Sequence, residues 1–210
     1  MMGNTQTYRI GLFFGSFDPM HVGHLNIVEK CLNVGIVNGV DIIPAWQNPF
    51  KSSYTTTYDE RILMCNFAIV PLIKKHRNVF VDNIEGKLAQ IHGENKPILT
   101  YDVLQFKEFA KTSNVEYVII CGDDVFTQIP TWFNGDVILN NYKFIVFSRD
   151  LKDKIEHPSI IHHLETNGYN DVSSSKIREM IKNSEDVSPY LTNLQMWYIN
   201  QANIYKSQDV

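Results

Sequence analysis

The sequence predicts an α/β fold built on a doubly wound parallel sheet. Apolar runs of strand length alternate along the chain with segments whose apolar residues repeat at the period of a helix. Glycines at Gly15 and Gly122 directly follow the first and the fourth apolar run. Both glycines therefore belong at the carboxyl-end rim of the sheet, where such folds bind ligands. The 210 residues are enough to bury the core of one such domain.

The individual elements follow from the pattern of apolar residues. Five runs are predicted to be strands: Tyr8–Phe14, Gly39–Ala45, Asn78–Ile84, Val115–Cys121 and Tyr142–Ser148. Four segments between and after them are predicted to be helices: Val22–Leu32, Tyr58–Val70, Tyr101–Lys111 and Asp124–Phe133. Thr57 and Glu60 have the spacing of a capping box, and Pro71 is expected to end the helix that they begin.

The C-terminal part of the chain is predicted to be helical. A helix follows Ser173, and a closing helix is expected over Pro189–Tyr205, with apolar residues on one face. We find no internal repeat and no linker in the sequence. We therefore expect a single domain over residues 1–210, with a C-terminal helical extension over about 174–205.

Composition narrows the class of protein. A formal net charge of −4 argues against a protein that binds nucleic acid without sequence preference, because such proteins need a broad basic face. No apolar run approaches the length of a membrane span, and no signal peptide precedes the first strand. Three separated cysteines, Cys31, Cys65 and Cys121, indicate a reducing compartment. We expect a cytoplasmic protein that binds neither nucleic acid nor membranes, and leave a nuclear location and a homodimer open.

The segment from Gly15 to His24, Gly-Ser-Phe-Asp-Pro-Met-His-Val-Gly-His, carries the strongest functional signal. It lies between the first predicted strand and the first predicted helix. His21 and His24 are three residues apart, so both side chains are expected on one face of the helix's first turn. Free backbone N–H groups and the positive end of the helix dipole point the same way, which makes a site for phosphate. Two surface histidines are the alternative, and zinc is disfavoured because no third ligand has a supporting spacing.

This segment resembles the signature of the nucleotidyltransferase superfamily, which contains adenylyl- and cytidylyltransferases. The resemblance implies a Rossmann-like nucleotidyltransferase fold, in which the histidine pair stabilises the phosphates of the nucleotide. His21 and His24 would then be catalytic. The segment would also supply residues that bind ATP: Gly15, Ser16, Phe17, Gly23 and His24.

A second anion site is predicted near the end of the chain. The serines before the helix that contains Ile177 supply hydroxyls and a helix N-cap, and Arg178 follows one turn later. A serine cap before an amphipathic helix is common, so this segment is a weak signal when it is taken alone. It resembles the second signature of the same superfamily, which implies that Ser174, Ser175 and Arg178 hold the β- and γ-phosphates of ATP and that Arg178 is catalytic.

Four further positions bear on which transferase this is. Lys51 lies in a polar loop after the second strand, Thr100 opens a predicted helix, Asp124 follows the fourth strand, and Trp132 lies in a polar-flanked loop. Three of them have a simpler interpretation. Lys51 would be a solvated loop lysine, Thr100 a helix cap, and Trp132 a core aromatic residue.

Together the segments from Tyr8 to Arg178 resemble the nicotinate-mononucleotide adenylyltransferase family. This resemblance implies that Lys51 contacts the nucleotide phosphate and that Thr100 and Tyr101 bracket the nicotinate carboxylate. Trp132 would stack on the pyridine ring, and Gly122 and Asp124 would line the adenosine side. Departures from the usual family residues occur at Phe14, Phe50, Val103, Asp123 and Val125.

The function implied is transfer of AMP from ATP to nicotinate mononucleotide, which gives deamido-NAD and pyrophosphate. Mg²⁺ would bind through the phosphates of ATP. Three alternatives stay open at this point. Pantetheine-phosphate adenylyltransferase shares both signatures, a cytidylyltransferase is another member of the superfamily, and a catalytically silent nucleotide sensor would keep the binding site alone.

Overall fold

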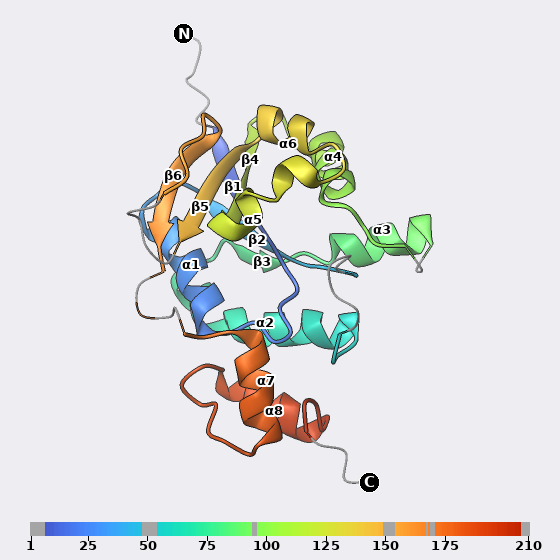
Figure 1. The fold of residues 1–210 in the computed structure, drawn as a ribbon, viewed down its shortest axis with the longest axis vertical. Coiled ribbons are helices and arrows are strands. Elements are labelled where there is room, and N and C mark those ends of the chain that lie inside the picture. Colours follow the sequence, from blue (N-terminus) through green and yellow to red (C-terminus); the bar gives the residue numbers. More distant parts are fainter. Residues whose placement is uncertain are drawn as a thin grey trace.

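A parallel sheet forms the centre of the molecule (Figure 1). The computed structural model describes residues 7–47, 54–93, 96–148, 154–166, 168 and 171–206. Within them six strands pair in the order β3-β2-β1-β4-β5-β6, and every pair is parallel. The strands are β1 (Tyr8–Gly15), β2 (Gly39–Pro44), β3 (Val79–Val81), β4 (Val115–Gly122), β5 (Lys143–Ser148) and β6 (Ile160–Glu165). The order reverses between β1 and β4, so the predicted doubly wound α/β fold is confirmed.

Helices cover both faces of this sheet. The helical elements are α1 (Val22–Asn33), α2 (Tyr58–Lys75), α3 (Ile84–His92), α4 (Thr100–Ala110), α5 (Asp123–Phe126), the 3₁₀ turn η1 (Ile129–Thr131), α6 (Gly135–Asn141), α7 (Ser174–Lys182) and α8 (Asn193–Gln201). Successive residues of a strand face opposite sides. Ile120 of β4 accordingly packs in the cluster that contains buried residues of α1 and α2, whereas Ile119 packs with α3, α4 and α6.

The prediction that Pro71 ends its helix is wrong. The helix begins at the predicted capping box, where Thr57 accepts a hydrogen bond from the Glu60 backbone N–H. It then continues through Pro71 to Lys75. Because proline has no N–H, it leaves the carbonyl of Phe67 without its partner inside the helix. The hydroxyl of Thr192, at the start of α8, donates to that carbonyl at 3.3 Å and supplies the missing hydrogen bond.

Several elements differ from the prediction. The expected helix Asp124–Phe133 is divided into α5 and η1, and the expected strand Asn78–Ile84 is reduced to the three residues of β3. Three elements were not predicted: α3, α6 and β6. β6 contains His162 and His163, which we expected on a polar surface; both are half-buried in a strand that pairs with β5. This segment forms a strand because β5 supplies backbone hydrogen-bond partners, and its polar sequence alone does not predict that pairing.

The C-terminal helices lie beyond α2, away from the sheet (Figure 1). Buried residues of α7, α8 and the segments around them form a separate apolar cluster, to which Met64 of α2 also belongs. The closing helix is shorter than the predicted Pro189–Tyr205 and covers Asn193–Gln201. Among the described residues, no helix combines the length and the apolar character that a membrane span requires.

Candidate active site

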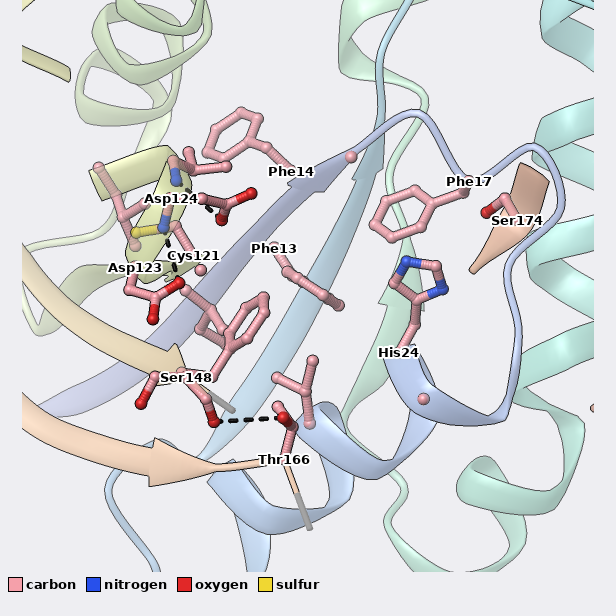
Figure 2. Close-up of a pocket in the computed structure, with 18 of the residues that line it drawn as sticks. Phe13, Phe14, Phe17, His24, Cys121, Asp123, Asp124, Ser148, Thr166 and Ser174 are labelled. Carbon is pink, nitrogen blue, oxygen red and sulfur yellow. Dashed lines mark hydrogen bonds between the residues drawn. The ribbon is translucent and has the colours of Figure 1, made fainter. Parts of the chain in front are cut away.

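A cavity of about 680 Å³ opens at the carboxyl ends of β1 and β4, where the strand order reverses (Figure 2). This is the place where open α/β sheets bind ligands. Ten residues that the sequence analysis selected line it: Gly15, Phe17, His21, Gly23, His24, Thr100, Gly122, Asp124, Trp132 and Ser174. The fold therefore brings both signature segments to one cavity.

The two histidines form the N-terminal cap of α1. His21 is the N-cap residue itself, and its Nδ1 accepts a hydrogen bond from the Gly23 backbone N–H at 3.2 Å. The Nδ1 of His24 accepts from the backbone N–H of His21, also at 3.2 Å. The ring centroids lie 3.8 Å apart. A backbone N–H group of the same turn holds each ring, so the two rings have a fixed position relative to each other.

The capping bonds also determine where the histidine protons lie. A ring nitrogen that accepts from a backbone N–H carries no proton, so each neutral imidazole carries its proton on Nε2. His21 is only 6% exposed, and burial lowers its pKa to about 4. At neutral pH His21 is consequently an uncharged hydrogen-bond donor. His21 would therefore act on phosphate as a hydrogen-bond donor and not as a positive charge.

Phe17 fixes the loop between β1 and the histidines. Its backbone is in the left-handed region, with φ at 47°, and its side chain is 2% exposed. The ring packs edge-on against Phe13 and His24, at centroid distances of 5.3 and 5.1 Å (Figure 2). A Cβ atom on Gly15 would lie 2.7 Å from this ring. The close approach of the ring therefore requires glycine at position 15.

Two adjacent carboxylates lie on the opposite side of the cavity, after β4 (Figure 2). Asp123 accepts a hydrogen bond from the Asp124 backbone N–H at 2.7 Å, and Asp124 accepts from the Val125 backbone N–H at 2.9 Å. A side chain at Gly122 would collide with the Asp124 carboxylate. Asp123 lines the cavity as well, although the sequence analysis noted it only as a departure from the family.

The second signature segment lies against the first. Ser173 caps α7, and the hydroxyl of Ser174 donates to the Pro19 carbonyl at 2.9 Å. The guanidinium of Arg178 donates to the carbonyl of Asp18 at 2.7 Å and to the hydroxyl of Ser175 at 3.1 Å. Of these residues, only Ser173 and Ser174 line the cavity. Arg178 does not line the cavity; it holds the loop between β1 and His21 through the Asp18 carbonyl.

The remaining selected residues have mixed positions. Ser16 and Tyr101 are next to cavity residues but do not line the cavity themselves, and the Tyr101 ring packs edge-on against Phe133. Lys51 lies outside the described residues. The interpretation of Thr100 as a helix cap is wrong: Leu99 is the N-cap residue of α4, and no side chain caps this helix.

The cavity lining includes residues that were not selected from the sequence, among them Phe13, Phe147, Ser148 and Thr166. Ser148 and Thr166 lie at the ends of β5 and β6, and the hydroxyl of Thr166 donates to the Ser148 carbonyl at 3.2 Å (Figure 2). Ser148 ends a predicted strand, so the rule that ligands bind at carboxyl ends was sufficient to find it. Thr166 follows a strand that was not predicted.

Comparison with known proteins identifies the family. The model of the cytidylyltransferase-like family matches residues 12–180. The chain belongs to this family. A relative from Fusobacterium nucleatum, named probable nicotinate-nucleotide adenylyltransferase, is 33% identical over 188 residues, which cover 86% of this chain and 91% of the relative. A relative of the same name from Flavobacterium psychrophilum is 30% identical over 202 residues, which cover 94% and 99%.

A solved structure agrees with the fold. The nicotinic acid mononucleotide adenylyltransferase of Plasmodium falciparum, complexed with NaAD, superposes with a TM-score of 0.74. The alignment covers 94% of this chain and 97% of that protein, at 22% identity. At this identity the comparison supports the Rossmann-like nucleotidyltransferase fold, and the two bacterial relatives place the chain among the nicotinate-nucleotide adenylyltransferases of the family.

The donor set of the cavity bears on metal binding. Enzymes of this cytidylyltransferase-like family generally use a divalent metal ion together with ATP. Among the described residues, no three histidine, cysteine, aspartate or glutamate side chains gather where they would hold an ion. Asp123 and Asp124 are the carboxylates that line the cavity. One or two carboxylates suit Mg²⁺, which keeps several waters and binds chiefly to substrate phosphates.

Proposed function

We propose that this protein transfers AMP from ATP to nicotinate mononucleotide and releases deamido-NAD and pyrophosphate. The observation that carries the proposal is the pair of adjacent, backbone-fixed histidines that line the cavity. The relatives named probable nicotinate-nucleotide adenylyltransferase support it. The Plasmodium falciparum structure, which shares the fold, was solved with NaAD bound.

The reaction needs no nucleophile from the protein. A phosphate oxygen of nicotinate mononucleotide attacks the α-phosphorus of ATP in line and forms the new P–O bond. The bond between the α-phosphorus and the bridging oxygen breaks, and pyrophosphate leaves with that electron pair. The attacking phosphate is already ionised at neutral pH. The protein therefore contributes positioning and stabilisation of charge on the phosphate oxygens.

His21 and His24 supply that stabilisation in the proposal. Both Nδ1 atoms accept from backbone N–H groups of the cap, so the Nε2–H groups are the donors that the proposal assigns to phosphate oxygens. Because the two rings are fixed before substrate binds, little reorganisation is needed during the reaction.

ATP is assigned to the side of the cavity where the two signatures meet. Arg178 and the serines at the start of α7 would hold the β- and γ-phosphates. Arg178 uses two of its five N–H groups on Asp18 and Ser175. The others remain to donate to phosphate. The first signature adds Gly15, Ser16, Phe17, Gly23 and His24 to the proposed ATP site. Gly122 and Asp124, across the cavity, would line its adenosine side.

Nicotinate mononucleotide is assigned to the side next to α4. Trp132 and Thr100 line the cavity there, and α4 begins without a side-chain cap, which suits a site where backbone N–H groups bind a carboxylate. We propose that Thr100 and Tyr101 bracket the nicotinate carboxylate, that Trp132 stacks on the pyridine ring, and that Lys51 contacts the phosphate. Mg²⁺ would arrive on the ATP phosphates and neutralise part of their charge.

The proposed location is the cytoplasm. Cys31, Cys65 and Cys121 are free and buried, as expected for a protein of a reducing compartment. Burial raises the pKa of the Cys31 thiol to about 12, so this thiol is unreactive in the folded protein.

A coupled assay of pyrophosphate release tests the function. We expect turnover with ATP and nicotinate mononucleotide, and much slower turnover with ATP and pantetheine phosphate. The product is checked by mass spectrometry as deamido-NAD. Preference for pantetheine phosphate would assign the chain to the second adenylyltransferase class. Tight ATP binding without turnover on either acceptor would identify a nucleotide sensor.

A further inference from the structure

The loop that carries His21 is held by the C-terminal part of the chain. Three successive carbonyls of this loop accept hydrogen bonds from distant side chains. The Asp18 and Pro19 carbonyls accept from Arg178 and Ser174, as described above, and the Met20 carbonyl accepts from the side-chain amide of Gln195 at 2.7 Å. Gln195 is completely buried. The loop is thus shaped by residues that follow it by more than 150 positions.

The backbone N–H that starts α1 is held in the same way. Val22 donates to the carbonyl of Tyr190 at 3.0 Å. The two residues on either side of His21 therefore both bond to the segment that contains α8. The imidazole of His21 has its own bond to Gly23 one residue further. The position of the His21 ring therefore depends on the position of the backbone of residues 20–23.

The carboxylate of Asp18 is the fixed point of the loop. It is 3% exposed and accepts hydrogen bonds from the Tyr205 hydroxyl at 2.6 Å, the Thr56 hydroxyl at 2.7 Å and the Thr55 backbone N–H at 3.3 Å. The Arg178 guanidinium lies 4.0 Å away. A buried carboxylate needs such partners, because an unpaired one costs far more than an exposed one.

Tyr205 is well suited to hold this carboxylate. Its side chain is 7% exposed, in contact with the sulfur of Met64 on α2. Burial, and then the neighbouring Asp18 carboxylate, raise the pKa of Tyr205, so its hydroxyl keeps the proton that it donates. Tyr205 follows α8 in the chain, so its hydrogen bond to Asp18 links the C-terminal extension to the loop that carries His21.

We propose that Tyr205 is a positioning residue for catalysis: through the Asp18 carboxylate it sets the place of His21 at the reacting phosphate. The inference rests on the proposed function of the histidines and extends it to a residue outside the cavity. Errors of about 1 Å in the position of a catalytic group reduce rates by about 100-fold, so a small shift of this loop is sufficient to matter.

The variant Tyr205→Phe tests the proposal, because it removes one oxygen atom and leaves the ring in place. We expect kcat to fall roughly tenfold or more, with both KM values changed by less than about twofold, since a displaced donor stabilises the transition state less but leaves ground-state contacts intact. Thr56→Val removes the other hydroxyl from Asp18 and should show the same split. It serves as the second test should Tyr205→Phe not fold.

Tyr198→Phe is the matched control. Tyr198 lies in α8, its ring packs against Phe67, and its hydroxyl makes no hydrogen bond within the described part of the chain. We expect wild-type kcat from this variant. Reduced kcat in both tyrosine variants would assign the effect to general weakening of the extension and would overturn the proposal.

Hydrogen exchange gives a readout that is independent of turnover. The Gly23 amide donates to the His21 ring, so its exchange reports how firmly this ring is held. We expect faster exchange at Gly23 in Tyr205→Phe than in the wild type or in Tyr198→Phe. Unchanged exchange together with unchanged kcat would refute the positioning role. An inactive wild type would refute the proposed function instead, and the exchange experiment would still decide the inference.

Discussion

At the scale of single residues, the cap of a helix fixes the two histidines on which the proposed function depends. The hydrogen bonds that cap the N-terminus of α1 also determine which nitrogen of each ring carries the proton. His21 remains uncharged at neutral pH because it is buried. A neutral N–H donor can still stabilise developing charge on phosphate, and it does so without the cost of burying a charged imidazole.

His24→Ala tests the contribution of the more exposed ring. We expect kcat to fall by roughly 10²–10⁴-fold, the range for loss of a preorganised donor to a transition state. Circular dichroism should show an intact fold. His92→Ala, an exposed histidine at the end of α3, is the control and should keep wild-type turnover. Normal kcat in folded His24→Ala would remove this residue from the mechanism.

The lowered pKa of His21 predicts a pH dependence of stability. In the unfolded chain this histidine takes up a proton near pH 6.5, but in the folded protein only near pH 4. Its contribution is therefore fully present above pH 6.5 and is lost as the pH falls from 6.5 to 4. Linkage gives a loss of about 2 kcal/mol between pH 7.5 and pH 5.

The variant His21→Asn isolates this contribution, because its side-chain oxygen can still accept from the Gly23 N–H. Urea unfolding of both proteins at pH 7.5 and at pH 5 measures the difference. We expect the wild type to lose about 2 kcal/mol more than the variant over this range. Equal losses would mean that His21 titrates normally and is hydrated in the folded protein.

How far the sequence determines the site depends on the kind of residue. His21, His24 and Ser174 stand in short signatures with a chemical meaning, and the structure brings all three to one cavity. The burial of Asp18 has no such local signal. Its partners Thr56 and Tyr205 are 38 and 187 residues away, and no spacing rule connects them. Long-range contacts of this kind appear only in the folded molecule.

At the scale of elements, α2 and α8 show the same limit. Proline at position 71 is a correct local signal for the end of a helix. The helix continues because Thr192 supplies the hydrogen bond that the proline omits. Thr192 also caps α8, where it accepts from the backbone N–H of Gln195. One side chain thus completes two helices, and a tertiary contact overrides the local preference.

A double-mutant cycle tests this account of α2. Thr192→Val removes the cap of α8 and leaves the Phe67 carbonyl unpaired, so we expect a loss of about 2–3 kcal/mol in the free energy of unfolding. In a Pro71→Ala background the alanine N–H supplies the bond to Phe67, and the same change should cost only about 1 kcal/mol. Urea denaturation of the four proteins gives the coupling. Additive losses of stability would show that the contribution of Thr192 does not depend on the proline.

The sheet was easier to predict than its edge. Strands β1, β2, β4 and β5 each contain one charged residue but are otherwise mainly apolar, as expected for strands that are buried on both faces. Strand β6 is at the edge of the sheet and reads Ile-Ile-His-His-Leu-Glu, with three polar residues in six. An edge strand is paired on one side and partly exposed, so its composition resembles that of a loop.

At the scale of the whole molecule, segments far apart in the sequence contribute to one cavity. Both signature segments, the start of α4 and Trp132 line it. The proposed nicotinate site has backbone donors at an uncapped helix start. A carboxylate can pair with donors alone, whereas the NH₂ of the corresponding amide would face another donor.

We therefore expect the acid to be preferred over nicotinamide mononucleotide by at least about tenfold in kcat/KM. One unsatisfied buried polar group costs about 1–3 kcal/mol, and about 1.4 kcal/mol corresponds to a factor of ten. Steady-state kinetics with both mononucleotides measures the ratio. Trp132→Ala should weaken both substrates and leave the ratio unchanged, because stacking does not sense the exocyclic group. Equal kcat/KM for acid and amide would refute the donor-only pocket.

The contact between Asp18 and Tyr205 has a consequence for the time course of folding. It closes a loop of 187 residues, so its formation has the large entropic cost of a very distant contact. The strands and the cavity involve residues that all precede α8, and they can assemble before the tail docks. A refolding chain would then regain its sheet first and its activity last. Recovery of turnover should lag behind recovery of the circular dichroism signal. The lag measures the time that the C-terminal extension needs to dock against the loop that carries His21.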